Sequence, residues 1–252
     1  HLSRAMLLLS LMLLGVGASA AETQAQEGEI WYRVQIVQIR PEKLTDFMEL
    51  YRDEINPALR AGGVPWRSAW LAGQFGDLYE RQLITPLIGF SELDGGAPLR
   101  RALGQRDYDR ALDKLRETTE GRQAYAVRYR RDLSVESDDV SGLSIARVTN
   151  VQVAVGRGAD FEAFLRDNVA TFRDAGVVFG IYQRQFGPGS VVWQIVENLR
   201  SYAELARGGI LRAFGDQSCA AEQLTGVITG IERYVLEYDP DLSFTGVTDP
   251  TQ

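Results

Sequence analysis

The chain has 252 residues, a formal net charge of −7 and 45% apolar residues, which is enough to bury a hydrophobic core. Its acidic balance, without any basic run, argues against a nucleic-acid-binding protein. The single histidine is His1. If processing removes the first residues, no histidine remains for a catalytic triad, a zinc site or a haem ligand, so we expect no metal and no cofactor.

The N-terminal segment is typical of a secretory signal peptide. Arg4 precedes an apolar run, and Ala18-Ser19-Ala20 offers small residues for cleavage. We therefore interpret residues 1–20 as a signal peptide and residues 21–29 as a polar, disordered segment. The mature chain is then expected to be secreted or periplasmic, with no attachment to a membrane. An uncleaved N-terminal anchor is the alternative, although the apolar run is short for a membrane span.

Residues 30–134 predict one α+β unit, because the apolar residues recur first with strand spacing and then with helix spacing. The helix before Gly62 shows an apolar stripe at Leu44, Phe47, Met48, Tyr51, Ile55 and Leu59. In chain order we expect a strand over 31–40, this helix, strands over 64–75 and 78–86 joined by a turn at 76–77, helices over 91–103 and 108–120, and a last strand carrying Tyr125, Val127 and Tyr129.

Residues 145–244 predict the same order again. The expected elements are a strand over 147–155, a helix with the stripe Phe161, Phe164, Leu165, Val169 and Phe172, strands over 177–186 and 191–197 joined by a turn at 187–189, helices over 202–214 and 220–226, and a last strand over 231–238.

Three blocks of sequence similarity relate the two units. Segment 46–62 aligns with 160–176, 74–104 aligns with 185–215, and 129–134 aligns with 238–243. A period of about a hundred residues fits a duplicated small domain rather than a solenoid. We therefore predict two tandem repeats, 30–134 and 145–244, joined by an acidic linker over 135–144 and followed by a tail over 245–252. For the linker, a solvated tether is favoured over a calcium loop.

The order β-α-β-β-α-β is the ferredoxin-like pattern, an antiparallel sheet with helices on one face. Because the other face of each sheet needs cover, we expect the two sheets to face each other as an eight-stranded barrel with helices outside. The protein would then be a monomer with an intramolecular pseudo-dimer, or a homodimer.

On the aligned helix segments, the hairpin at 187–193 and the closing segment 238–243, the chain resembles the dimeric α+β barrel superfamily. It is most similar to its NIPSNAP-like, tandemly duplicated secreted members. The superfamily includes cofactor-free oxygenases, isomerases and haem enzymes that use a histidine. The resemblance therefore implies the fold and leaves the activity open, and the missing histidine disfavours the haem members.

The central hairpins carry the candidate ligand-binding residues. Period-two spacing places Trp66, Ser68 and Trp70 on one face of a strand, and Glu80 and Gln82 on one face of the next. Alignment of the second unit adds Tyr182, Arg184 and Trp193 as counterparts. These side chains line an aromatic pocket with a few polar groups, or they simply fill the core between the sheets.

The sequence identifies no catalytic set, and Glu80 is the only candidate. A buried Glu80 needs a partner, which Arg184 would supply across the barrel, or it acquires a raised pKa and becomes a candidate general base. A Glu80 that faces solvent at a strand end is the alternative. The lone Cys219 is expected to be a small buried apolar residue rather than a reactive thiol, since no basic residue flanks it.

Three functions remain open at this point. The first is a secreted or periplasmic protein that binds a small apolar or aromatic molecule. The second is a cofactor-independent monooxygenase or isomerase that acts on a small aromatic or lipid-like substrate. The third is a structural or interaction module without a ligand.

Overall fold

The computed structural model describes residues 29–137, 139, 141–188, 191–207, 209–210 and 223–245. The predicted signal peptide, all but the last residue of the segment 21–29, Cys219, the first three residues of the predicted helix over 220–226 and all but the first residue of the predicted tail lie outside the described residues. The chain divides after Ile30, and the fold described below belongs to the unit Trp31–Gln252.

Eight strands close into an antiparallel barrel, as the sequence predicted. The sheet has the order β3-β1-β4-β6-β7-β5-β8-β2-β9, and an additional pairing of β3 with β2 closes it. Closure leaves the eight strands of the ring without a free sheet edge. The strands are β1 (Ile30–Ile39), β2 (Trp66–Leu71), β3 (Glu80–Leu87), β4 (Thr119–Tyr129), β5 (Ile145–Val153), β6 (Gly180–Phe186), β7 (Val192–Leu199), β8 (Ile228–Tyr238) and β9 (Phe244–Thr245).

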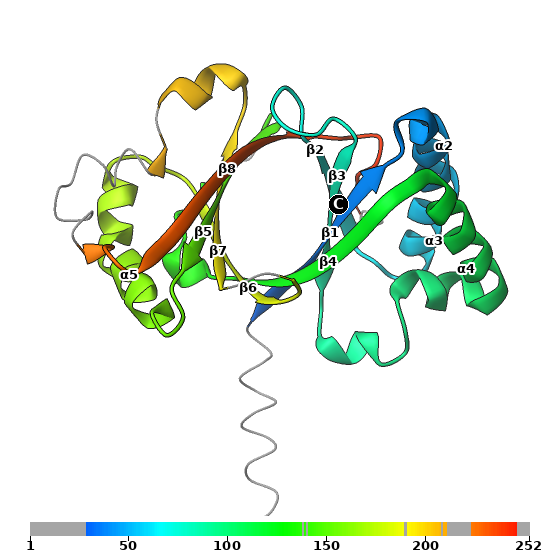
Figure 1. Cartoon of the computed structure of the whole chain (residues 1–252), viewed down its shortest axis with the longest axis horizontal. Coiled ribbons are helices and arrows are strands. Elements are labelled where there is room, and N and C mark those ends of the chain that lie inside the picture. The colour runs from blue at the N-terminus through cyan, green and yellow to red at the C-terminus, as the bar shows by residue number, and fades with distance from the viewer. Residues whose placement is uncertain are drawn as a thin grey trace, which may run out of the picture. The chain divides into compact units, whose positions relative to one another are not determined.

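The helices lie outside this barrel, with α2 to α4 against one side and α5 against the opposite side (Figure 1). None of the helices among the described residues is long and apolar enough to cross a membrane. The helical elements are η1 (Pro41–Lys43), α2 (Leu44–Glu49), the π-helical η2 (Leu50–Ile55), α3 (Asn56–Ala61), η3 (Phe90–Leu93), α4 (Pro98–Thr118), η4 (Arg131–Leu133), α5 (Gly158–Asp174) and η5 (Tyr202–Arg207).

Several predicted boundaries need correction. The two helices predicted over 91–103 and 108–120 are present as the two parts of α4, which meet at a kink at Gly104, where φ is +73°, but the first part begins at Pro98 and residues 91–93 belong to η3. Glycine tolerates this left-handed conformation, so the helical pattern continues after the bend. Of the helix predicted over 202–214, residues 202–207 form the 3-10 segment η5. Of the helix predicted over 220–226, residues 224–226 form turns instead. Strand β9 was not predicted, because two residues carry no periodic signal.

Each half packs its helices against the outer face of its own strands. In the first half the predicted stripe is buried, and Phe47, Tyr51 and Ile55 lie with Val37 and other strand residues in one apolar cluster. In the second half, Phe161, Phe164, Leu165 and Phe172 of α5 pack on the outer face of the strands in the same way. The apolar stripes of the sequence therefore define the outer cores rather than the inside of the barrel.

The two halves have the same strand order. The first half runs β4-β1-β3-β2 and the second runs β8-β5-β7-β6 around the barrel. Their registers also correspond, because Ile36 lies opposite Gln82 in one half and Asn150 lies opposite Gln194 in the other. The halves join through β4 with β6 and through β2 with β8. This correspondence assigns an equivalent position in one half to each position in the other.

The end of each half packs into the core of the other half. Leu133, which follows β4, is fully buried in the cluster built around α5. Leu242 and Phe244, which follow β8, are buried in the cluster built around α2 and α3. Val135 pairs with Phe179, and Phe244 pairs with Arg67. The start of the predicted linker is thus packed rather than solvated, which corrects the expectation for Val135.

A serine holds each of these exchanged segments in the same way. The Ser134 hydroxyl accepts a hydrogen bond from the Ile181 N–H at 2.9 Å and donates one to the Arg130 carbonyl at 2.7 Å. The Ser243 hydroxyl accepts from the Ala69 N–H at 2.9 Å and donates to the Asp239 carbonyl at 2.6 Å. Both serines therefore satisfy a strand N–H of the other half.

We expect Ser134→Ala and Ser243→Ala each to lower the free energy of unfolding by about 1–3 kcal/mol, because each leaves a strand N–H without a partner. Chemical denaturation of the full chain measures this loss. The matched control is Ser91→Ala, since Ser91 is exposed and should change stability little. Equal stability of all three variants and the unmodified chain would contradict the proposed role of the two serines.

Candidate functional site

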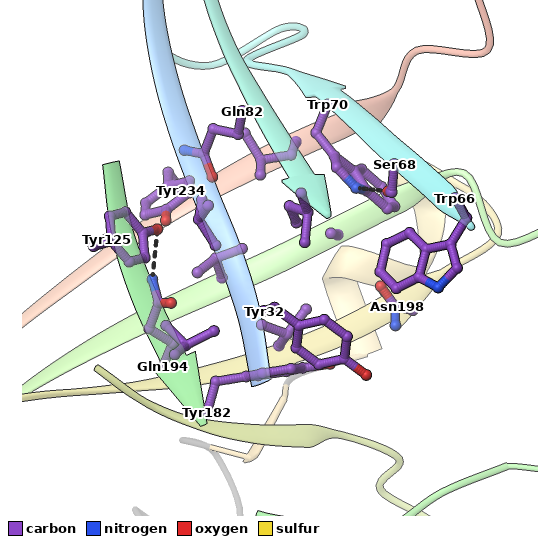
Figure 2. Close-up of a pocket in the computed structure, with 17 residues that line it drawn as sticks. Tyr32, Trp66, Ser68, Trp70, Gln82, Tyr125, Tyr182, Gln194, Asn198 and Tyr234 are labelled. Atoms are coloured by element: carbon purple, nitrogen blue, oxygen red, sulfur yellow. Dashed lines mark hydrogen bonds between the residues drawn. The ribbon is translucent and has the colours of Figure 1, made fainter. Parts of the chain in front are cut away.

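The barrel encloses a cavity of about 200 Å³ whose lining comes from all eight barrel strands. Figure 2 shows the side chains around it, with aromatic rings and amide groups pointing toward one another from opposite strands. The lining residues are Tyr32, Val34, Trp66, Ser68, Trp70, Gln82, Ile84, Tyr125, Val127, Ala146, Val148, Tyr182, Gln194, Val196, Asn198, Tyr234 and Leu236.

The middle of the cavity is apolar, and none of the described residues that line it carries a charge. One apolar group comes from each half: Val34 and Val127 lie in one cluster, and Val148 and Leu236 lie in another. These positions alternate along the strands with residues of the outer cores. The cavity is therefore a property of the joined halves, and neither half forms it alone.

One end of the cavity gathers tyrosine hydroxyls and side-chain amides. The Gln194 amide donates hydrogen bonds to the Asn150 side-chain oxygen at 2.9 Å and to the Tyr125 hydroxyl at 3.4 Å (Figure 2 shows the second). Burial raises the pKa of the Tyr125 phenol, and the hydrogen bond with Gln194 partly offsets this rise. Tyr125 is therefore a neutral phenol that can donate a hydrogen bond to a bound oxygen atom.

Tyr234 is the second tyrosine at this end. Its hydroxyl interacts with the side chains of Gln82 and Asn150, and burial raises its pKa above the ordinary value for tyrosine. The Gln82 amide in turn donates to Glu80 at 3.1 Å. Tyr125 and Tyr234 occupy equivalent positions in the two halves, as do Gln82 and Gln194. The polar end is thus built twice from the same residue types.

A group of aromatic rings surrounds Tyr182 and Tyr32 elsewhere in the cavity. The Tyr182 ring centroid lies 5.1 Å from that of Tyr129 and 5.9 Å from that of Tyr32, and the Tyr32 centroid lies 5.7 Å from that of Trp66. The Tyr129 hydroxyl donates to Glu136 at 2.6 Å. Burial, then this carboxylate, raises the pKa of Tyr129 to about 12. These rings supply flat apolar surfaces against which an aromatic molecule can stack.

The structure brings together five of the predicted site residues, since Trp66, Ser68, Trp70, Gln82 and Tyr182 all line the cavity. The Trp70 indole N–H donates to the Ser68 hydroxyl.

Glu80 and Arg184 do not form the predicted ion pair. Glu80 instead accepts the hydrogen bond from Gln82, and the Arg184 guanidinium lies 4.0 Å from the centroid of the Tyr125 ring. Neither residue belongs to the cavity lining among the described residues. Arg184 also donates to the Pro188 carbonyl at 3.1 Å.

Trp193 lies away from the cavity, in the outer core. It is fully buried, and its ring centroid lies 5.5 Å from that of Phe161. The sequence alignment matched Trp193 with Gln82, whereas the strand pairing matches Gln82 with Gln194. A slip of one residue turns a strand side chain to the opposite face. The position equivalent to Gln82 in the second half therefore also holds a glutamine, Gln194.

Sequence reasoning also missed Tyr125, Tyr234 and Gln194 as members of the site. A usable signal was present, because Tyr125 and Tyr234 each stand four residues before the tyrosine that begins an aligned closing segment, 129–134 or 238–243. That spacing places both on the same strand face as those tyrosines. Tyr32 and Asn198 carried no comparable signal.

The residues present do not fit a histidine-ligated metal or haem. The sequence has no histidine after His1. Among the described residues, no group of three or more histidine, cysteine, aspartate or glutamate side chains could hold a metal ion. The polar groups at the cavity are phenols and amides, which are hydrogen-bonding groups rather than the usual ligands of such sites.

No protein-family model and no curated protein matches this sequence. Solved structures do resemble it. An anthrone oxidase-like protein superposes with a TM-score of 0.57 at 11% identity, over 88% of this chain and 96% of its own. A proposed monooxygenase from Lactobacillus acidophilus NCFM superposes with a TM-score of 0.55 at 8% identity, over 86% of this chain and 96% of its own. Chlorite dismutase from Candidatus Nitrospira defluvii, in complex with imidazole, superposes with a TM-score of 0.53 at 10% identity, over 89% of this chain and 96% of its own.

The chain has the dimeric α+β barrel fold. At these identities the likeness establishes the fold alone, and the expected fold is confirmed. The dimeric α+β barrel of this chain consists of one polypeptide, because both four-strand sheets belong to it.

The two tryptophans Trp193 and Trp66 should respond differently to truncation. We expect Trp193→Ala to lower the free energy of unfolding by about 3–5 kcal/mol, because it opens a hole in a fully buried core. Trp66 borders a cavity and is only half-buried, so Trp66→Ala should cost clearly less. Urea denaturation of the two variants compares the losses, and the reverse order would contradict the placement of Trp193 in the outer core.

Proposed function

We propose that the barrel cavity binds a small, neutral aromatic molecule that carries one or two oxygen atoms. The observation that carries this proposal is the lining itself, which combines aromatic and aliphatic side chains with neutral phenols and amides and, in the part of the chain that the structure describes, includes no charged residue. Ligand sites commonly have this composition, an apolar wall with a few polar groups that orient the ligand.

The absence of charge among the described lining residues favours a neutral ligand. A buried carboxylate or ammonium group needs a counter-charge, and without one its transfer from water is unfavourable. The neutral hydroxyls of Tyr125 and Tyr234 would donate to a ligand oxygen, and the amide of Gln194 would offer both a donor and an acceptor.

The volume limits the ligand to one or two rings. An apolar cavity of roughly 150 Å³ in another protein accommodates benzene. The present cavity, about 200 Å³, is somewhat larger. It is smaller than the pockets of about 300–1,000 Å³ that hold drug-sized molecules. A bicyclic phenol is therefore a suitable probe.

We expect 2-naphthol to bind the full chain and 2-naphthoate, which has the same rings and a negative charge, to bind at least about tenfold more weakly. Isothermal titration calorimetry measures both affinities. Tyr125→Phe should weaken binding of 2-naphthol by about three- to tenfold, because it removes one hydrogen bond and keeps the ring. Tyr79→Phe, outside the cavity lining, is the control. No binding of either compound would favour the third function, a structural or interaction module.

A second candidate function is cofactor-independent monooxygenation of such a molecule. The similar structures named as a monooxygenase and as anthrone oxidase-like support it. In a reaction of this type, a ring CH₂ group and O₂ would give C=O and H₂O, so that one oxygen atom enters the product and the other leaves as water. The phenols of Tyr125 and Tyr234 would hold the substrate oxygen and stabilise negative charge that develops on it.

An oxygen electrode tests this candidate with oxindole as substrate, because it is a neutral two-ring molecule with a ring CH₂ group next to a carbonyl. If the candidate is right, the full chain should consume O₂ faster than the uncatalysed reaction, and the double variant Tyr125→Phe/Tyr234→Phe should lose most of that excess rate. Binding of 2-naphthol with no excess O₂ consumption would leave a binding protein. An isomerase has no specific observation in its favour.

A tandem duplication, the NIPSNAP-like resemblance and export of the protein are further proposals. Equal strand orders and equivalent residues in the two halves support the tandem duplication, and with it the NIPSNAP-like resemblance. The composition of residues 1–20 supports export to the periplasm or the medium. N-terminal sequencing of the exported protein tests the last point, with a start near Ala21 or Glu22 expected.

A further inference from the structure

A second cavity, of about 80 Å³, lies in the first half outside the barrel wall, and three arginines line it. Arg67 comes from β2, Arg33 from β1 and Arg122 from β4. The other lining residues are Gln35, Tyr51, Ile55, Leu59, Val64, Thr85, Ala97, Pro98, Leu99, Tyr108, Leu112 and Leu115. None of these described residues is acidic, so the cavity concentrates positive charge.

Arg67 forms the buried part of this arginine cluster. Its residue is 5% exposed, and its Nε has no hydrogen-bond partner. One of its terminal nitrogens donates to the Asn56 side chain at 2.9 Å, and its guanidinium lies 5.4 Å from the centroid of the Tyr51 ring. An unpaired buried cation is unfavourable, and desolvation lowers the pKa of Arg67 to about 10. The guanidinium therefore lacks a counter-charge.

Arg33 and Arg122 lie close enough to Arg67 for their positive charges to repel its charge. Both lower the pKa of Arg67 through charge repulsion, and Arg122 does the same to Arg33, after the larger effect of burial. Arg33 is half-buried and Arg122 is exposed, so the three side chains extend from the interior to the surface. Among the described residues, no ion pair involves any of the three.

The second half shows how the same position is neutralised there. Arg147 is the equivalent of Arg33, and it lies opposite Glu197 across the strand pair. Their side chains form a bidentate ion pair, with both N–O distances 2.8 Å. In the first half, Arg33 lies opposite Thr85 instead. The first half thus has the cation of this pair without its carboxylate, and Arg67 and Arg122 add further positive charge.

We propose that this arginine cluster binds a phosphate group. The space equals that of roughly two to three water molecules, which suits a phosphate headgroup rather than a larger anion. Arginine forks match phosphate oxygens with paired, charge-assisted hydrogen bonds. A phosphate dianion offsets more of the charge of three arginines than a carboxylate does. Inorganic phosphate and the terminal phosphate of a small metabolite share this chemistry.

Calorimetric titration of the full chain with inorganic phosphate at pH 7.5 tests the proposal, and chloride of equal ionic strength is the reference. We expect saturable phosphate binding and a Tm that rises with phosphate concentration, because a ligand of the folded state stabilises it. Acetate should bind more weakly. Phenyl phosphate distinguishes the sources, since binding tighter than that of inorganic phosphate indicates a phosphomonoester and weaker binding indicates the free ion.

Arg33→Gln and Arg122→Gln should each weaken phosphate binding by about tenfold or more, through loss of charge-assisted hydrogen bonds. Arg33→Lys should retain part of the affinity and serves if the glutamine variant folds poorly. Arg106→Gln is the matched control, because Arg106 is exposed on α4 and outside the cavity lining. No phosphate effect beyond that of chloride, or an equal loss in Arg106→Gln, would overturn the proposal. Tyr125→Phe should leave phosphate binding unchanged, which separates this site from the barrel cavity.

Discussion

Closure of the barrel is the constraint on which the rest of the structure depends. A four-stranded sheet covered by helices on one face leaves its other face and both edges open. Here β4 pairs with β6 and β8 pairs with β2, so each half supplies the cover and the edge partner of the other. The segments around Leu133 and Leu242 add to the contact between the halves, because each packs into the apolar core of the other half. The halves are therefore one cooperative unit rather than two linked domains.

The interior chemistry follows from this closure. Burial inside the barrel favours neutral groups, so burial raises the pKa of Tyr125 and Tyr234 and keeps them protonated. Gln194 illustrates this, since it is 5% exposed and bonds both Asn150 and Tyr125. Groups held in this way are fixed before any ligand arrives, which lowers the cost of binding. The same groups are poor proton acceptors, so binding is the primary function proposed and oxidation the secondary one.

Periodicity predicted the elements of the fold, and register limited the prediction of the site. The stripe from Phe47 to Leu59 and the strand alternation around Val34 were sufficient to predict helices, strands and a barrel with helices outside. A shift of one position in a strand decides which residues face inward. The weak sequence similarity between the two halves does not align their strands to within one residue. Trp193 was therefore placed in the cavity although it lies in the outer core, while Gln194 beside it was overlooked. Partners such as Arg184 with Tyr125 depend on three-dimensional packing that no local pattern encodes.

Comparison of the halves also separates positions that match between them from positions that differ. Ser134 and Ser243 make the same kind of bond, because each accepts a hydrogen bond from a strand N–H of the other half. The polar groups of the cavity correspond as well, with Gln82 and Tyr234 facing Gln194 and Tyr125. Arg33 and Arg147 differ in their partners, because only Arg147 forms an ion pair, with Glu197, whereas Arg33 lies opposite Thr85. In the first half, Arg33 lies beside Arg67 and Arg122 with no carboxylate among the described residues that line their cavity. The proposed phosphate would supply the negative charge that Glu197 supplies to Arg147 in the second half.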